Sequence, residues 1–225
     1  SVARVLLEQG EIITAEPGAM VSMGPAIAIE TQMSGGGVFG ALKSVVGGES
    51  LFRTTFTAKN GPDEVLLAPS NTGDIVGLPV SGKMYVQRGS YLASTPELTI
   101  GVEGSLRAML SGEGLFLLTF TGQGVLLLSS FGAIHRVDLA PGQEYIVDTS
   151  HIVAFDASIR YRVEKAAGPT QGVGGFLKGV MTSALSGEGL VCRYTGPGTI
   201  LLQTRSIQNF AQALSPFMPK TSQGS

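Results

Sequence analysis

The sequence of 225 residues contains one cysteine, two histidines and no tryptophan. The single cysteine, Cys192, excludes an internal disulfide and a four-cysteine metal cage. His135 and His151 are too few for a three-histidine site, so a metal would need carboxylates as further ligands. No apolar run approaches the roughly 18 residues of a membrane-spanning helix, and no signal peptide is recognisable at the start. These absences predict a cytoplasmic protein; because the first residue is Ser1 and not Met, the native N-terminus stays undecided.

Charged side chains are also scarce, at 14% of the residues, against about a quarter in an average protein. The formal net charge is −2. A nucleic-acid-binding protein usually carries a basic face, so we do not expect nucleic acid as a partner. No residue pattern indicates a cofactor or a resident metal.

Glycine, by contrast, is abundant: there are 32, where an average composition would give about 16. Many of these glycines punctuate a block that occurs three times, within 46–67, 109–128 and 185–202. Each copy has Gly-Glu, an apolar strand, a glycine-containing turn and a second apolar strand. Glycine supplies the positive φ of tight turns, so we expect the turns at 59–62, 122–124 and 196–198 to close β-hairpins.

A second shared block precedes the first one in each copy, at 10–21, 82–92 and 142–153. Each is followed by an alternating segment that ends in glutamate, namely Ile27–Glu30, Leu98–Glu103 and Ile159–Glu164. Period-two alternation is typical of half-buried strands. We therefore predict an all-β fold of three repeated β-sandwich modules in a pseudo-threefold arrangement, forming one body. The predicted boundaries are 1–70, 71–131 and 132–206, with a helix and tail at 207–225.

That C-terminal helix is expected from Ile207 to Leu214. Ser206 is a suitable N-cap residue, and Ile207, Phe210 and Leu214 fall on one helical face. The residues after Leu214 are expected to fray, because they include two prolines and few apolar side chains.

Three inserts interrupt the copies, at 36–47, 104–110 and 172–185. The third carries an apolar stripe at helical spacing, so we expect short helices there. A threefold axis would bring all three inserts to one end of the molecule, where their apolar residues form a candidate interaction surface. Its residues are Phe39, Leu42, Val45, Leu106, Met109, Leu110, Phe176, Leu177, Val180 and Met181. Two interpretations are left standing: the surface meets a partner or a membrane, or the inserts cover free sheet edges.

Polar residues also recur at equivalent positions. The glutamates are Glu49, Glu113 and Glu188, and the basic residues of the inserts are Lys43, Arg107 and Lys178. Three carboxylates near a threefold axis could hold a hard cation. The simpler interpretation, which we favour, is that each glutamate accepts backbone N–H groups at a turn and pairs with the basic residue of its own insert.

His151 lies close in sequence to Asp148 and Ser150, a combination found in hydrolases. Successive strand residues point to opposite faces, so Ser150 and His151 would need a bend to face one substrate. The equivalent positions of the other copies hold Ala19 and Ser90, so the module itself does not require a histidine. Cys192 lies in an apolar strand, and we expect it to be a small buried residue and not a nucleophile.

Several segments together resemble one known family. They lie at 16–21, 48–52, 112–116, 147–155 and 196–206, and are spread over nearly the whole chain. In these segments the sequence is similar to the altered-inheritance-of-mitochondria family, whose prokaryotic members were long described only as uncharacterised proteins. The resemblance implies a triplicated β-sandwich related to the double-stranded β-helix and to the tryptophan RNA-binding attenuation protein. Fungal relatives are associated with mitochondrial inner-membrane organisation and respiratory complexes, and no catalytic residues are implied.

The sequence thus favours a non-enzymatic structural or interaction protein that forms a homo-oligomer through its apolar, insert-bearing end. A membrane surface or a membrane protein is a further expected partner, which would make the chain cytoplasmic and peripheral to a membrane. The alternative is a small-ligand- or metal-binding β-sandwich enzyme that uses the repeated glutamates and His151.

Overall fold

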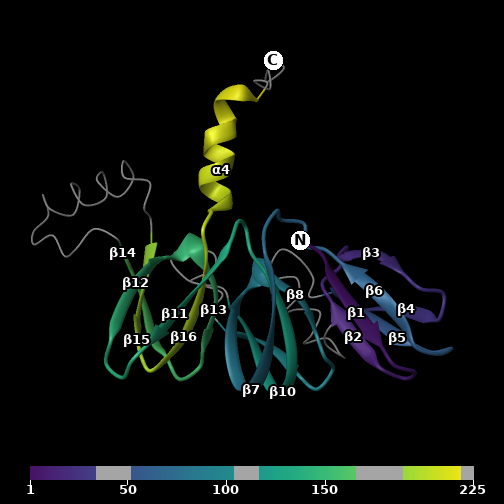
Figure 1. Ribbon diagram of the computed structural model, residues 1–225. Helices are drawn as coiled ribbons and strands as arrows, with labels where there is room; N and C mark the ends of the chain where they lie inside the picture. The colour runs from purple at the N-terminus through teal and green to yellow at the C-terminus, as the bar shows by residue number, and fades with distance from the viewer. Residues whose placement is uncertain (34–51, 104–116, 166–189, 219–225) are drawn as a thin grey trace, which may run out of the picture.

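The computed structural model describes residues 1–33, 52–103, 117–165 and 190–218. In these ranges the chain forms sixteen strands, three short 3₁₀ turns and one α-helix, so the predicted all-β class is confirmed. The strands fall into three groups that follow one another along the chain (Figure 1). We refer to β1–β6 as the first group, β7–β10 as the second and β11–β16 as the third.

The first group holds six short strands in two antiparallel sets. Strands β1 and β3 flank β6, and strands β2 and β4 flank β5. The bounds are β1 Ala3–Leu7, β2 Ile12–Ala15, β3 Met20–Met23, β4 Ile27–Met33, β5 Phe52–Ala58 and β6 Asp63–Leu67.

The second group uses two long strands that pair over thirteen residues, β7 (Ile75–Gln87) and β10 (Leu117–Ser129). Gly82 and Gly122 face each other at the midpoint, and their φ values of 112° and 135° are accessible to glycine alone. The short strands β8 (Tyr91–Ser94) and β9 (Thr99–Glu103) pair with the two halves of β10.

The third group again has six strands. Strands β11 and β13 flank β16, and strands β12 and β14 flank β15. The bounds are β11 Ile134–Leu139, β12 Glu144–Asp148, β13 Ile152–Asp156, β14 Arg160–Lys165, β15 Leu190–Thr195 and β16 Gly198–Gln203.

The predicted hairpins at 59–62, 122–124 and 196–198 are wrong. Strand β5 pairs with β2 and β4, whereas β6, on the other side of the 59–62 turn, pairs with β1 and β3. The turn at 196–198 separates β15 and β16 in the same way, and β10 runs through 122–124 without a break. The glycines therefore make corners at which a strand leaves one partner set for another. Such corners need the same positive φ as a hairpin turn, so the local sequence does not distinguish the two.

Two seams join the groups into a ten-stranded sheet. At the first seam β2 pairs with β8, and at the second seam β7 pairs with β13. Apolar side chains fill three core clusters, in which Phe56, Phe120 and Tyr194 are among the largest fully buried side chains. Strands β3 and β12 are each at the edge of a separate three-stranded sheet, and they lie at opposite ends of the molecule (Figure 1).

Helix α4 spans Ile207–Leu214, as the sequence predicts. The Ser206 hydroxyl accepts a hydrogen bond from the Asn209 amide at 3.4 Å, which confirms the expected N-cap. The helix projects beyond the sheets (Figure 1), and its Phe210 ring meets Phe131 at a centroid distance of 5.4 Å. Within the described ranges, none of the helices has the length and apolar character needed to cross a membrane.

Candidate functional site

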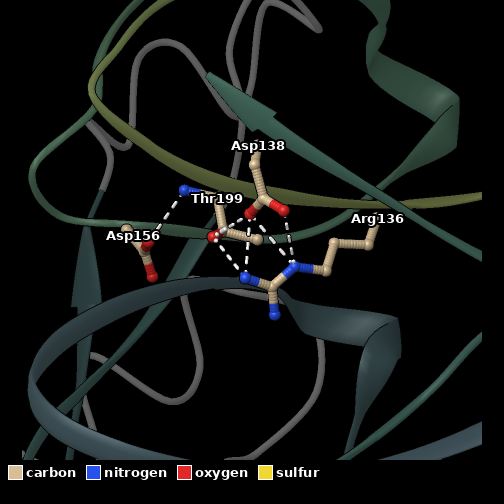
Figure 2. Close-up of polar contacts among 4 residues, drawn as sticks. All are labelled: Arg136, Asp138, Asp156 and Thr199. Carbon is tan, nitrogen blue, oxygen red and sulfur yellow. Dashed lines mark hydrogen bonds and ion pairs between the residues drawn. The ribbon is translucent and has the colours of Figure 1, made fainter. Parts of the chain in front are cut away.

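A polar cluster lies on the outer face of the third group, where β11, β13 and β16 meet (Figure 2). We call Arg136, Asp138, Asp156 and Thr199 the β11–β16 polar cluster. Arg136 and Asp138 are two residues apart on β11, so both side chains lie on the same face of the sheet. Thr199 lies directly opposite Asp138 on β16, and Asp156 ends β13.

Hydrogen bonds connect all four residues of this cluster (Figure 2). Arg136 Nε lies 3.0 Å from each carboxylate oxygen of Asp138, and Arg136 Nη2 donates to Thr199 Oγ1 at 3.2 Å. The Thr199 hydroxyl donates to Asp138 Oδ1 at 2.7 Å, and Asp156 accepts the Thr199 backbone N–H at 2.8 Å. The cluster therefore links three strands, β11, β16 and the end of β13.

The protonation states do not favour catalysis by Thr199. The hydrogen bond from Arg136 lowers the pKa of Asp138, and the Thr199 hydroxyl lowers it further. A general base works best when its pKa lies near the operating pH, so Asp138 is a weak base for its threonine neighbour. The Arg136 and Asp138 side chains are 60% and 63% exposed. An exposed ion pair of this kind adds little stability.

Two cavities flank the seams. The smaller, of about 270 Å³, lies beside the polar cluster at the second seam and is lined by Leu78, Pro79 and Phe155 among others. It is at the lower limit of the volumes usual for small-molecule sites. The larger, of about 910 Å³, is an open groove at the first seam between β1, β2, β7 and β10. Of its charged residues, Arg4 pairs with Glu64, and Glu11 accepts the Glu8 amide at 2.8 Å.

Glu16 lies where the chain crosses the first seam. Its backbone N–H donates to the Leu92 carbonyl at 2.9 Å. Burial raises the pKa of Glu16 from 4.5 to about 7, because a desolvated carboxylate is less stable than the neutral acid. The adjacent Tyr91 hydroxyl donates to the Thr14 carbonyl at 2.9 Å.

His151 and its neighbours hold the turn between β12 and β13. Asp148 Oδ1 accepts the Ser150 N–H at 2.8 Å, and His151 Nδ1 lies 2.8 Å from the Gln203 carbonyl oxygen. A carbonyl only accepts, so Nδ1 carries the hydrogen. The Gln203 side-chain amide donates back to the Ser150 carbonyl at 2.8 Å. The Asp148 carboxylate and the imidazole Nδ1 are thus both bonded to main-chain groups, and no Asp–His–Ser relay forms.

Cys192 is fully buried, which confirms the predicted role as a core residue. Burial raises the pKa of its thiol to about 11, so the reactive thiolate is scarce at neutral pH. Arg193, next in the chain, faces outward and pairs with Glu144 at 3.2 Å and Glu164 at 2.8 Å.

The ten apolar candidates of the predicted interaction surface, from Phe39 to Met181, lie outside the described residues. So do the six repeated polar positions, from Lys43 to Glu188. Among the residues that the structure does describe, no group of three or more His, Cys, Asp or Glu side chains is placed to hold a metal ion.

The exposed apolar side chains lie elsewhere. All four residues of β3 are exposed, including Val21 at 58%, and β12 exposes Ile146 at 49%. Helix α4 exposes Ile207, Phe210 and Leu214. Sequence reasoning missed the exposure of these two end strands, although 145–147 reads as three consecutive large apolar residues and 20–23 holds three large apolar residues around Ser22, both without charge. It also missed the β11–β16 polar cluster, for which the Arg-x-Asp spacing of a strand was the available signal.

The fold and these contacts define an all-β protein whose polar side chains serve mainly to hold strands and turns. The family model described as "Mitochondrial biogenesis AIM24" matches residues 1–205, and the chain belongs to this family, as the sequence resemblance predicts. An uncharacterised protein of Streptococcus pyogenes serotype M6 is 30% identical over 226 residues, with 96% of this chain and 86% of the relative covered. A crystal structure of a Streptococcus pyogenes protein, also 30% identical, has a TM-score of 0.76, covering 96% of this chain and 94% of that one.

Proposed function

We propose that this chain is a non-enzymatic structural or interaction protein that associates with further copies of itself. The observation that carries the proposal is the contrast between its polar and apolar groups. The polar candidates, such as His151 and Asp138, are engaged in strand and turn contacts, whereas large apolar side chains are exposed on β3, β12 and α4. Exposed apolar patches on a folded protein are typical of interaction surfaces.

The strand pairings support reading the chain as three copies of one module. The first and third groups each have two inner strands with a partner on either side, and the two halves of β10 are flanked in the same way by β7, β8 and β9. A register shift recurs at Met20/Ser22, Leu127/Leu128 and Ile152/Ala154. In this interpretation β7 corresponds to the first two strands of the other groups, joined into one, and β10 corresponds to their last two strands. This interpretation keeps the predicted likeness to the tryptophan RNA-binding attenuation protein and the threefold repeat. A closed pseudo-threefold arrangement would also need a seam between β12 and β3, which the described chain does not form within itself.

The inserts belong to the same proposal. In the sequence, each insert lies between two strands that pair antiparallel with each other. These pairs are β4 and β5, β9 and β10, and β14 and β15. Their apolar residues add to the contact surface in this scheme, and a membrane surface or membrane protein is the further partner we propose for them. The location we propose is cytoplasmic.

The test is the molar mass in solution, measured by light scattering on a size-exclusion column over a range of loading concentrations. We expect a mass that is a multiple of the 23.3 kDa chain. Changing Leu42, Met109 and Leu177 together to Asp tests the inserts, and Gln123→Asp, at an exposed polar position, is the matched control. A wild-type mass of 23.3 kDa at every concentration contradicts self-association.

A further inference from the structure

The two seams pair equivalent strands in the same register, whereas the equivalent strands at the two ends of the molecule are unpaired on that side. At the first seam Ala15 pairs with Ala93 and Thr14 with Ser94. At the second seam Val86 pairs with Ala154 and Tyr85 with Phe155. In the three-module interpretation β7 stands for the first two strands of the second group, so β8 is the third strand of that group. At both seams the second strand of one group then pairs antiparallel with the third strand of the next. Within the described chain, the second strand of the third group, β12, and the third strand of the first group, β3, have no such partner.

Equivalent positions follow from the pairings inside each group. Phe56, Phe120 and Tyr194 are the buried aromatic residues opposite Ile13, Met84 and Tyr145. The next residue along each strand is therefore equivalent: Thr14, Tyr85 and Ile146 form one set, and Ala15, Val86 and Val147 another. The shared register shift likewise makes Ser22, Ala93 and Ala154 equivalent.

We propose that β12 of one copy pairs antiparallel with β3 of a second copy, head to tail, with Val147 opposite Ser22 and Ile146 opposite Met23. This inference deepens the proposed function and rests on its three-module interpretation. The register is that of both existing seams, transferred to the two free edges.

The side chains at the free edges are those that such a seam would bury. At the second seam the Tyr85 ring meets Phe155 at 5.0 Å and Tyr161 at 5.7 Å between centroids. The equivalents of these three residues at the ends are Ile146, Met23 and Ile29. All three are large and apolar, yet they are exposed by 49%, 40% and 42%. Burying them against one another stabilises the contact in the same way as the aromatic side chains stabilise the second seam.

Charged residues and prolines normally blunt an exposed edge, but β3 reads Met-Val-Ser-Met. In β12 the charged residues stand only at the two ends, where Glu144 pairs with Arg193 and Asp148 accepts the Ser150 N–H, and the centre reads Tyr-Ile-Val. The partner is a second copy because β3 and β12 lie at opposite ends of the same chain (Figure 1). The two surfaces differ, so the contact is heterologous and produces a ring or a filament.

Complementation between two edge variants tests this contact. Ile146→Lys damages β12 and leaves β3 intact, whereas Met23→Lys does the reverse. Each variant alone is expected to have the mass of one 23.3 kDa chain, because the other copy always presents the damaged edge. An equal mixture is expected to form one-to-one dimers through the two intact edges. Circular dichroism checks that the variants fold, which we expect because both side chains are exposed.

Cross-linking tests the register. A Met23→Cys, Ile146→Cys double variant should form interchain disulfides and a covalent ladder on a non-reducing gel. Met23→Cys with Tyr145→Cys is the control, because Tyr145 is one residue out of register and points to the other face. The buried Cys192 is common to both variants.

The remaining outcomes separate this inference from the proposed function. An oligomer that survives both edge variants but dissociates when the inserts are changed overturns the β12–β3 contact and leaves self-association standing. An intrachain disulfide in a protein of one-chain mass shows that the edges meet within one molecule, which overturns both. A one-chain mass without any cross-link also overturns both.

Discussion

At the residue scale, most of the distinctive polar groups of this protein are engaged by its own main chain or by neighbouring strands. Asp148 caps a turn, His151 donates to a carbonyl, and Arg136 is held between Asp138 and Thr199. Burial raises the pKa of two further groups, Glu16 and Tyr194, and each gives a prediction.

Glu16 should make the stability of the fold depend on pH. Its pKa is about 7 in the folded state and near 4.5 in the unfolded chain, so the folded state binds the proton more tightly between these values. The contribution of the protonated form is complete below about pH 4.5 and is lost as the pH rises through about 7. Glu16→Gln should therefore flatten this decline, measured by urea unfolding at pH 5 and pH 8. An unchanged slope between these pH values would contradict the assignment.

Tyr194 tests the cost of a buried hydroxyl. No hydrogen-bond partner of ordinary geometry is found for this group among the described residues, and its neighbour Cys192 is a weak partner. Burial raises the pKa of Tyr194 above its usual value. We expect Tyr194→Phe to leave the free energy of unfolding unchanged or to raise it by up to about 1 kcal/mol.

Tyr91 provides the matched control. Its hydroxyl donates to the Thr14 carbonyl at 2.9 Å and shares a hydrogen bond with Ser94. Tyr91→Phe should therefore lower the free energy of unfolding by about 1 kcal/mol, a typical net value for one hydrogen bond. Equal losses in the two variants, measured by urea unfolding, would show that the Tyr194 hydroxyl has a partner.

At the element scale, the glycine corners decide how strands change partners. Gly122 and Gly82 face each other across β10 and β7, and both have positive φ. Their surroundings differ, however. A Cβ at Gly122 would lie 2.5 Å from the Glu97 carbonyl oxygen, whereas a Cβ at Gly82 would meet nothing within 4 Å.

These two glycines therefore form a matched pair of substitutions. Gly82→Ala should cost about 1–3 kcal/mol through backbone strain alone, and Gly122→Ala should cost more because the Glu97 backbone must also move. Urea unfolding of the two variants measures the difference. If Gly82→Ala proved the more damaging variant, the corner would depend on something other than this close contact.

The elements also show how far the sequence could predict the fold. Period-two alternation placed β4, β9 and β14, and the spacing of Ile207, Phe210 and Leu214 placed α4. Glycines of positive φ lie at 61, 122 and 198, within the three expected turns, but they form corners, and at 122–124 the strand continues. The pairing across these positions is predicted wrongly because a corner and a hairpin share the same local backbone demand. The exposed edges were missed for a related reason. Apolar residues such as Tyr145 and Ile146 resemble core residues until the pairing of each strand is known.

At the scale of the whole molecule, the two seams are not equally strong. The second seam pairs three residues on each strand and packs Tyr85 against Phe155 and Tyr161. The first seam pairs two residues on each strand, Thr14 with Ser94 and Ala15 with Ala93. Less apolar surface is therefore buried by the strand pairs of the first seam.

This difference predicts an order of opening. The first group, strands β1–β6, should separate at a lower free energy than the third group, strands β11–β16. Hydrogen exchange at increasing denaturant should show protected amides of β2 and β5 exchanging before those of β15 and β16. Simultaneous exchange in all three groups of the wild type would contradict the prediction.

When copies are joined head to tail, helix α4 is presented once by every copy of the assembly. The helix projects away from the sheets (Figure 1) and displays Ile207, Phe210 and Leu214 on an uncharged surface. Each copy is related to the next by the same operation, so these helices recur at a constant interval as a regular array. A single helix of eight residues presents a small contact, but an array is multivalent. A target with several binding grooves would be retained by avidity, and release of one helix would leave the others attached.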